Sequence, residues 1–353
     1  MTPVKFENIQ ALRGVAVLLV VFCHLQVIEQ KYSHGQMVLP AWLDYAIASV
    51  DLFFVISGFV IATVTRGQFQ SLPAAGRFIF QRVTRIYPPY WFYSAIVLII
   101  WWYKPELVNS AQGNQVNVLA SFLIIPQDLL PLVMVGWTLI HEMYFYLVIT
   151  IFMPIVPERG FPALLALWTL AVIIGSSFFM INFSGDYQAT AQVIFHPLTL
   201  DFIGGAAIAL LVNSRVGSKD RLIAGIGVFT FLFSLVWFSA DESIVKTEGW
   251  PRVALFGIPS MLAVYAAARA EIGGKVCFPK SMIKIGDASY SIYLSHVLVL
   301  AALGRIWAKM TITGVMMNVA MLVTMILATI SVGLLSYRWM ETPILNRFRK
   351  WRT

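Results

Sequence analysis

The chain has 353 residues, of which 59% are hydrophobic and 12% charged, and its mean hydropathy is +0.78. Such a composition excludes a soluble globular protein of this size and predicts one that crosses a membrane many times. The apolar segments are about 20 residues long, which favours helices over the shorter alternating strands of an outer-membrane barrel. The net charge of +8 does not indicate a nucleic-acid partner, because the basic residues gather in alternate loops.

We therefore expect an all-α polytopic membrane protein, a bundle of about ten transmembrane helices. In chain order the expected spans are 9–28, 45–65, 86–104, 137–156, 162–182, 194–213, 222–240, 252–270, 286–308 and 312–336. Segment 118–135 is apolar but short and broken by prolines, so we interpret it as re-entrant or interfacial. No repeat, linker or appended soluble domain is apparent, and residues 1–353 are expected to form one integral-membrane domain.

Lys and Arg predict the orientation, because they are enriched in cytoplasmic loops. With both termini in the cytoplasm, nineteen of the 25 Lys and Arg residues fall in the inner regions. We therefore expect a multi-pass membrane protein with both ends cytoplasmic and membrane lipids as neighbours.

The first expected span, 9–28, contains Arg13 and His24. Eleven residues correspond to three helical turns and about 20°, so both side chains share one face, about 16 Å apart along the axis. One interpretation is an anchor, with a snorkelling arginine and a satisfied core histidine. The shared face favours a function, because ionisable groups in spans usually face a bundle interior.

Four acid–base residues fall at one level of the bilayer. His24, Asp51, Glu142 and Asp201 each lie in the outer third of a span, counting about 1.5 Å per residue. An imidazole beside carboxylates can act as a general base. Structural links between helices, each contributing about 1 kcal/mol, are the alternative. We take His24, Glu142 and Asp51 as the candidate catalytic residues.

The helix around Glu142 has a mixed polar and aromatic face. Tyr146 lies one turn after Glu142, and Trp137 begins the span. We expect Trp137 and Tyr146 to line a pathway or the acceptor site. His141 points about 100° away from Glu142, which suggests a structural or gating role.

Segment 77–90 places an arginine cluster just ahead of the third span. Arg82 and Arg85 share a helical face, and we expect the two prolines that follow them to start a fresh helix. Guanidinium groups bind phosphates with a planar fork of donors. With Arg13 at a similar depth, the inner face is predicted to bind a polyanionic donor. The alternative is an ordinary positive-inside signal.

A polar stripe follows in segment 289–296. Ser289, Tyr293 and His296 recur at helical spacing, with Tyr290 beside them. We expect Tyr290, Tyr293 and His296 to line a pathway or the acceptor site. Contacts between helices are the alternative.

At this point the chain closely resembles the membrane-bound acyltransferase 3 family, whose members O-acylate carbohydrates and related acceptors. The matching motifs run from one end to the other: R-x10-H at Arg13 and His24, D-L-F-F-V-I-S-G-F at Asp51, R-x-x-R-I-x-P-x-Y at Arg82 and Arg85, W-T-L-x-x-E-x-x-F-Y at Trp137 and Glu142, and S-Y-x-I-Y-L-x-H at His296.

The resemblance implies an enzyme of the inner (cytoplasmic) membrane that takes an acyl group, most often acetyl, from cytoplasmic acyl-CoA. It implies delivery of that group to a sugar hydroxyl on the other side or at the membrane. It also implies that His24 is catalytic and that Arg13, Arg82 and Arg85 are essential or bind the donor. We expect acyl-CoA as co-substrate, a carbohydrate acceptor, no permanently bound cofactor, no metal and no nucleic acid.

Several alternatives stay open. His24 could activate the hydroxyl directly, or a serine (Ser57, Ser289 or Ser295) or His24 itself could carry an acyl-enzyme. A proton-coupled transporter or flippase of a glycan is the rival function, although no internal repeat supports it. An inert scaffold does not explain the arginine cluster. For the enzyme, we expect a CoA tunnel beside the first span, opening to the cytoplasm near Arg82 and Arg85.

Overall fold

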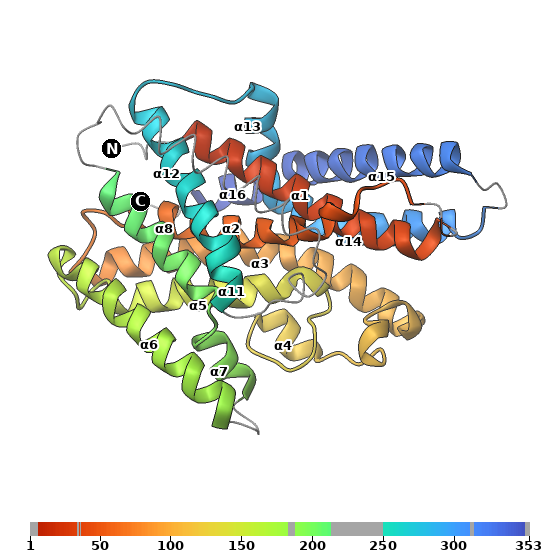
Figure 1. Cartoon of the computed structure of the whole chain (residues 1–353). Coiled ribbons are helices and arrows are strands. Elements are labelled where there is room, and N and C mark those ends of the chain that lie inside the picture. Colours follow the sequence, from red (N-terminus) through yellow and green to blue (C-terminus); the bar gives the residue numbers. More distant parts are fainter. Residues whose placement is uncertain are drawn as a thin grey trace. The chain divides into compact units, whose positions relative to one another are not determined.

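A computed structural model describes residues 6–33, 35, 37–182, 188–212, 250–310 and 314–349. Every regular element in these ranges is helical (Figure 1), which confirms the all-α class. The longer helices are α1 (Glu7–Tyr32), α2 (Ser49–Val64), α3 (Leu72–Tyr103), α5 (Trp137–Phe152), α6 (Phe161–Asn182), α8 (Thr199–Leu211), α12 (Ile258–Ile272), α14 (Ser289–Trp307) and α15 (Val315–Ser336).

Shorter helices connect them. The short α-helices are α4 (Val118–Leu123), α7 (Gln188–Ile194), α11 (Trp250–Arg252), α13 (Lys280–Asp287) and α16 (Thr342–Arg349). The 3₁₀ helices are η1 (Ala41–Ala48), η2 (Pro105–Leu107), η3 (Ser110–Gln112), η4 (Met134–Gly136) and η5 (Glu158–Gly160), and the π-helical turns are η7 (Val253–Gly257) and η8 (Tyr337–Glu341).

Among the described residues, eight helical stretches are long and apolar enough to cross a membrane. They coincide with eight of the ten expected spans. The expected span 222–240 lies outside the described residues, and 86–104 lies within the longer helix α3. The chain is thus a multi-pass membrane protein, while the count of ten and the cytoplasmic position of both termini stay predictions.

Segment 118–135 contains only the six-residue helix α4 before irregular backbone begins. Six residues are too short to cross a bilayer, so the expectation that this segment is not a span is confirmed. Tyr87 and Trp91 of α3 hold α4, because their side chains donate hydrogen bonds to the carbonyls of Leu123 and Phe122 (2.7 and 2.9 Å).

The prediction that a new helix starts at the prolines after the arginine cluster is wrong. Helix α3 is 32 residues long and contains both Pro88 and Pro89. Proline removes a backbone donor and usually kinks or ends a helix. The residues on either side of the prolines, Tyr87 and Trp91, bond to α4 through their side chains.

The chain forms two compact units. The first takes Met1–Ile56 and Val212–Trp339, and the second takes Ser57–Leu211 and Met340–Thr353. The expectation of one functional domain stays a prediction.

In the first unit α1 packs against α12, α13 and α14. The approach of α1 to α13 depends on Gly286, because a Cβ there would collide with the carbonyl of Gln10. Small residues allow membrane helices to approach closely in this way. The contact fixes the half of α1 that carries Arg13.

The start of α1 is capped by a distant carboxylate. Glu271 at the end of α12 accepts hydrogen bonds from the backbone N–H groups of Glu7 and Asn8 (2.6 and 2.8 Å). These N–H groups have no partner inside the helix, and a negative charge is favoured at this end of its dipole. The side-chain Nδ2 of Asn8 also donates hydrogen bonds, and these go to the carbonyls of Ala267 and Lys275.

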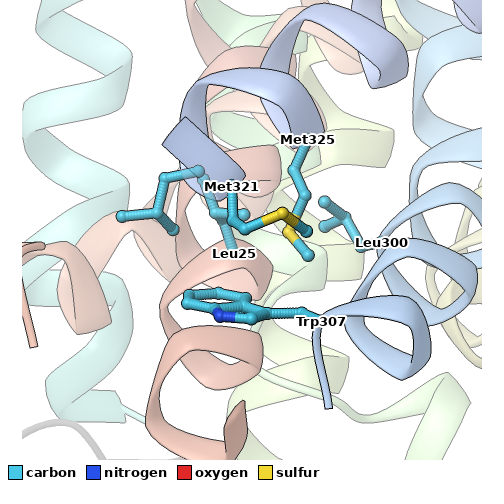
Figure 2. Close-up of a cluster of buried hydrophobic side chains, with 6 residues drawn as sticks. Leu25, Leu300, Trp307, Met321 and Met325 are labelled. Atoms are coloured by element: carbon cyan, nitrogen blue, oxygen red, sulfur yellow. The ribbon is translucent and has the colours of Figure 1, made fainter. Parts of the chain in front are cut away.

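The other half of α1 packs in an apolar cluster with α14 and α15 (Figure 2). Its buried members are Leu25, Leu300, Trp307, Met321, Leu322 and Met325. Because lipid tails are as apolar as these side chains, close packing rather than escape from water stabilises the contact. The cluster fixes the turn of α1 next to His24.

In the second unit α3, α5, α6 and α8 supply the packed helices. The rings of Phe145 and Phe202 stack at 4.4 Å, which joins α5 to α8. Gly58 of α2 touches the backbone of α8, and a Cβ there would collide with the carbonyl of Phe202. This unit positions Arg82, on α3, against α5.

Candidate functional site

The first unit brings together two of the predicted site residues, His24 of α1 and His296 of α14. Their ring centroids lie 4.9 Å apart in an edge-to-face arrangement, with 77° between the ring planes. His296 is fully buried and His24 is partly exposed. From the sequence, we expected His24 in the outer third of its span and the stripe that ends at His296 to reach only the midplane, with no sign that the two residues touch.

Each imidazole is held by a carbonyl of its own helix. His24 Nδ1 lies 3.0 Å from the carbonyl oxygen of Val20, and His296 Nδ1 lies 2.5 Å from that of Tyr293. A carbonyl only accepts, so in the neutral rings both Nδ1 atoms carry the proton. Both Nε2 atoms are then left with a free lone pair, which is the form a general base needs.

Aromatic residues surround this pair. The Tyr293 ring lies 5.6 Å from that of His296, and the Phe53 ring of α2 lies 6.1 Å from that of Tyr293. The neighbouring Tyr290 is 9% exposed. The predicted lining residues Tyr290 and Tyr293 therefore lie in the interior of the first unit, and Tyr293 contacts the His296 ring.

Asp51, the third candidate catalytic residue, forms an ion pair with Arg252 of α11. Arg252 Nη2 lies 2.8 Å from Asp51 Oδ2, and its Nε lies 3.2 Å from both carboxylate oxygens. Arg252 also donates to the carbonyl of Ile47. Because the Asp51 side chain is fully buried, the guanidinium is its charge partner, and a carboxylate held this way is poorly suited to accept a proton.

Sequence reasoning missed the role of Arg252. A signal was present, because Asp51 and Arg252 both fall near the outer end of an expected span. An intramembrane acid and an arginine at one level are candidates for an ion pair.

The guanidinium of Arg13 contacts a short polar chain. Its Nη1 lies 3.3 Å from Gln10 Oε1, and Gln10 Nε2 donates to Asp287 Oδ1 at 2.7 Å. This chain joins α1 to the end of α13 near the close contact at Gly286. Arg13 and His24 both belong to α1, in agreement with the predicted helix, and their roles stay predictions.

The second unit contains a separate polar cluster between α3 and α5. Tyr146 donates a hydrogen bond to Oε1 of Glu142 one turn earlier. The guanidinium carbon of Arg82 lies 5.8 Å from the centre of the Tyr146 ring and 5.5 Å from that of Phe78. Arg82 also lies within electrostatic reach of Glu142 and Arg85.

This cluster corrects the predicted position of Arg82. We expected Arg82 at the inner end of a span, at a different depth from Glu142. Because α3 begins at Leu72 and continues past Arg82, the guanidinium lies beside the middle of α5, next to Tyr146 and near Glu142. Two cations and one carboxylate leave this cluster with a net positive charge, which suits an anionic ligand.

Trp137 and His141 form an aromatic cluster with His196, in the break between α7 and α8. The rings of Trp137 and His141 lie 5.9 Å apart, and those of His141 and His196 lie 4.9 Å apart. His196 Nδ1 accepts a hydrogen bond from the backbone N–H of Leu198. His141 therefore packs between two aromatic rings, and its expected structural or gating role stays a prediction.

The chain is similar in sequence to several bacterial proteins. The chain is 28% identical over 317 residues to the exopolysaccharide production protein ExoZ of Rhizobium meliloti strain 1021, which covers 86% of this chain and 90% of that protein. It is 24% identical to the O-acetyltransferase OatA of Staphylococcus aureus strain NCTC 8325 / PS 47 and to the peptidoglycan O-acetyltransferase OatA of Listeria monocytogenes.

The two OatA matches cover 98% and 96% of this chain but 58% and 55% of those proteins, so the chain spans just over half of their length. No solved structure matches the chain significantly. Residues 6–338 match the family described as Acyltransferase domain. Since that match includes nearly the whole chain, this multi-pass membrane protein belongs to the acyltransferase 3 family of acyltransferases.

Proposed function

We propose that the protein is an O-acetyltransferase of the inner membrane that moves an acetyl group from cytoplasmic acetyl-CoA to a hydroxyl of a cell-surface or lipid-linked glycan. Family membership supports the acyl transfer. The names of ExoZ and of the two OatA proteins support a polysaccharide acceptor and an acetyl group. Basic residues gathered on one predicted side support a cytoplasmic donor.

The observation that carries the proposal is the fixed tautomer of His24. Its Nδ1–H bonds to the Val20 carbonyl, so Nε2 is free to accept a proton. In the proposed reaction Nε2 takes the proton of the acceptor hydroxyl while the oxygen bonds to the acyl carbon. The carbon–sulfur bond of the thioester then breaks, and the CoA thiolate accepts this proton from Nε2, which returns His24 to its neutral form.

Arginines are proposed to bind the donor. Arg85 and Arg82 supply positive charge near Glu142, and Arg13 supplies it on α1. The nucleotide part of CoA carries phosphates, which guanidinium groups bind with paired hydrogen bonds. Because Arg82 already contacts Tyr146, we assign the phosphate contact first to Arg85 and an electrostatic role to Arg82.

The test uses the purified protein in lipid nanodiscs with acetyl-CoA labelled in the acetyl group. We expect release of free CoA thiol, dependent on added acceptor, and loss of that release in His24→Ala. Cys23→Ala, next to it on α1, is the matched control and should keep the activity. A transporter of glycans would leave the thioester intact, and that result would refute the proposal. Mass spectrometry of the surface glycan, with and without the gene, then identifies the acceptor.

A further inference from the structure

His296 has a buried ring nitrogen, Nε2, that could accept a hydrogen bond but has no partner in the described part of the chain. The residue is fully buried, and within the described part of the chain its Nε2 makes no hydrogen bond. Nδ1 is already bonded to the Tyr293 carbonyl, so the lone pair on Nε2 is exposed to an environment without a donor. Buried polar atoms are nearly always paired, and an exception in a native structure calls for an explanation.

The surroundings give His296 little freedom to find another partner. Gly333 of α15 lies against Ile292, one turn before His296, where a Cβ would collide with the α14 side chain and backbone. Two turns after His296, Gly304 lies against the ring of Tyr32 of α1. Both contacts hold α14 close to its neighbours, so the imidazole is fixed against the His24 ring.

The resting state offers no positive charge next to this ring, but the proposed reaction creates one. When His24 takes the proton of the acceptor hydroxyl, its ring becomes a positively charged imidazolium inside the protein. The neutral ring of His296, at 4.9 Å between centroids, is a polar group next to it. A fixed lone pair beside a developing positive charge lowers the barrier without any rearrangement.

We infer that His296 is a positioning residue for His24: its ring fixes the orientation of the His24 imidazole, and its unpaired Nε2 stabilises the imidazolium that forms during transfer. This inference rests on the proposed function, since it needs a reaction in which His24 accepts a proton. His296 forms no covalent bond in it. The proton moves from the acceptor oxygen to His24 Nε2 and from there to the CoA thiolate.

A purely structural His296 predicts different behaviour. A packing role depends on ring volume, so phenylalanine would replace it well. A role through the lone pair depends on an acceptor atom, so phenylalanine would fail and a residue with an amide oxygen would restore part of the function. The two explanations therefore rank His296→Phe and His296→Gln in opposite orders.

The experiment measures kcat and KM for acetyl-CoA and acceptor in the full chain in nanodiscs, for wild type, His296→Phe and His296→Gln. We expect His296→Phe to lower kcat by roughly 30–300-fold, as for loss of a group that assists proton transfer. Both KM values should change by less than about threefold, because the contact is made in the transition state. His296→Gln should recover about tenfold of the lost rate, through an acceptor that is less well placed.

Leu300→Val, one turn further along α14, is the packing control and should keep kcat within about threefold. Thermal unfolding is recorded for each variant, so that loss of folded protein is separated from loss of rate. A wild-type kcat in His296→Phe, or a lower kcat in His296→Gln than in His296→Phe, would overturn the inference while the proposed function stands. If wild-type protein fails to cleave acetyl-CoA, the proposed function itself is wrong.

Discussion

The guanidinium of Arg252 binds both carboxylate oxygens of Asp51, with the shortest distance, 2.8 Å, between Nη2 and Oδ2. The pair joins the start of α2 to the helix that begins at Trp250, and the Asp51 side chain is completely buried. It offers a structural reason for an acidic residue inside an apolar span. The pair therefore gives Asp51 a part in fixing α2, and its predicted catalytic role stays untested.

We expect removal of one partner of this pair to be strongly destabilising. Asp51→Asn or Arg252→Gln should cost about 3–5 kcal/mol of unfolding free energy, because each leaves a buried charge without its partner. Replacing both residues, as in Asp51→Leu with Arg252→Met, should recover most of that loss. Thermal unfolding of the purified proteins in one detergent measures both effects. Equal melting temperatures for the single variants and wild type would contradict the assignment.

The cluster on α5 makes a separate prediction. Tyr146→Phe removes the hydrogen bond to Glu142. The loss should lower the free energy of unfolding by about 1.5–3 kcal/mol and lower kcat by roughly 10–100-fold. Glu142→Gln should lower it by about 10²–10⁴-fold if the carboxylate orients a catalytic group. Tyr144→Phe is the matched control, since its hydroxyl bonds to the Ile194 carbonyl instead. If the Tyr146 and Tyr144 variants behave alike in acetyl transfer, the cluster has no special role.

The two arginines of α3 should respond differently to substitution. Arg85→Ala should raise KM for acetyl-CoA more than it lowers kcat, and Arg85→Lys should restore only part of the affinity, because lysine lacks the planar fork. Arg82→Ala should also reduce the amount of folded protein, because Arg82 is packed on Phe78 and Tyr146. Steady-state kinetics and size-exclusion yield distinguish these effects. If Arg85→Ala binds acetyl-CoA as well as wild type, Arg85 does not bind the donor and serves only to orient the chain in the membrane.

Helix packing at Gly286 can be tested without an activity assay. Gly286→Ala places a methyl group against the backbone of Gln10 and should lower the unfolding free energy by about 1–3 kcal/mol. Gly76→Ala is the control, because a Cβ there meets no atom within 4 Å and alanine favours a helix. A thermal stability of Gly286→Ala equal to that of Gly76→Ala would show that α1 and α13 separate easily.

Sidedness tests the proposed route of the donor. In sealed vesicles of known orientation, acetyl-CoA should be consumed only from the cytoplasmic face, while the acetylated glycan appears on the other. Arg13 and His24, about 16 Å apart along α1, set a distance that an extended pantetheine arm can roughly match. Equal consumption of acetyl-CoA supplied to the opposite face of tight vesicles would rule out this route.

Apolar runs of about 20 residues predicted the helices well, because a bilayer demands that length regardless of neighbours. The same runs could not show that α3 continues through its prolines, because a proline usually kinks or ends a helix. Counting residues predicts a level in the bilayer for His24 and Asp51, but it could not indicate their partners. Which helices touch depends on small residues such as Gly286, and no periodicity reveals the helix that packs against them.

The cap on α1 has a consequence for how the protein is made. Glu271, which binds the first amides of α1, emerges from the ribosome more than 200 residues after Glu7. At ordinary translation rates that interval lasts roughly 10–50 s. Throughout it, α1 sits in the bilayer with neither its cap nor His296 yet synthesised. The polar groups of a newborn α1 must therefore be accommodated for that time without the contacts that the finished fold gives them.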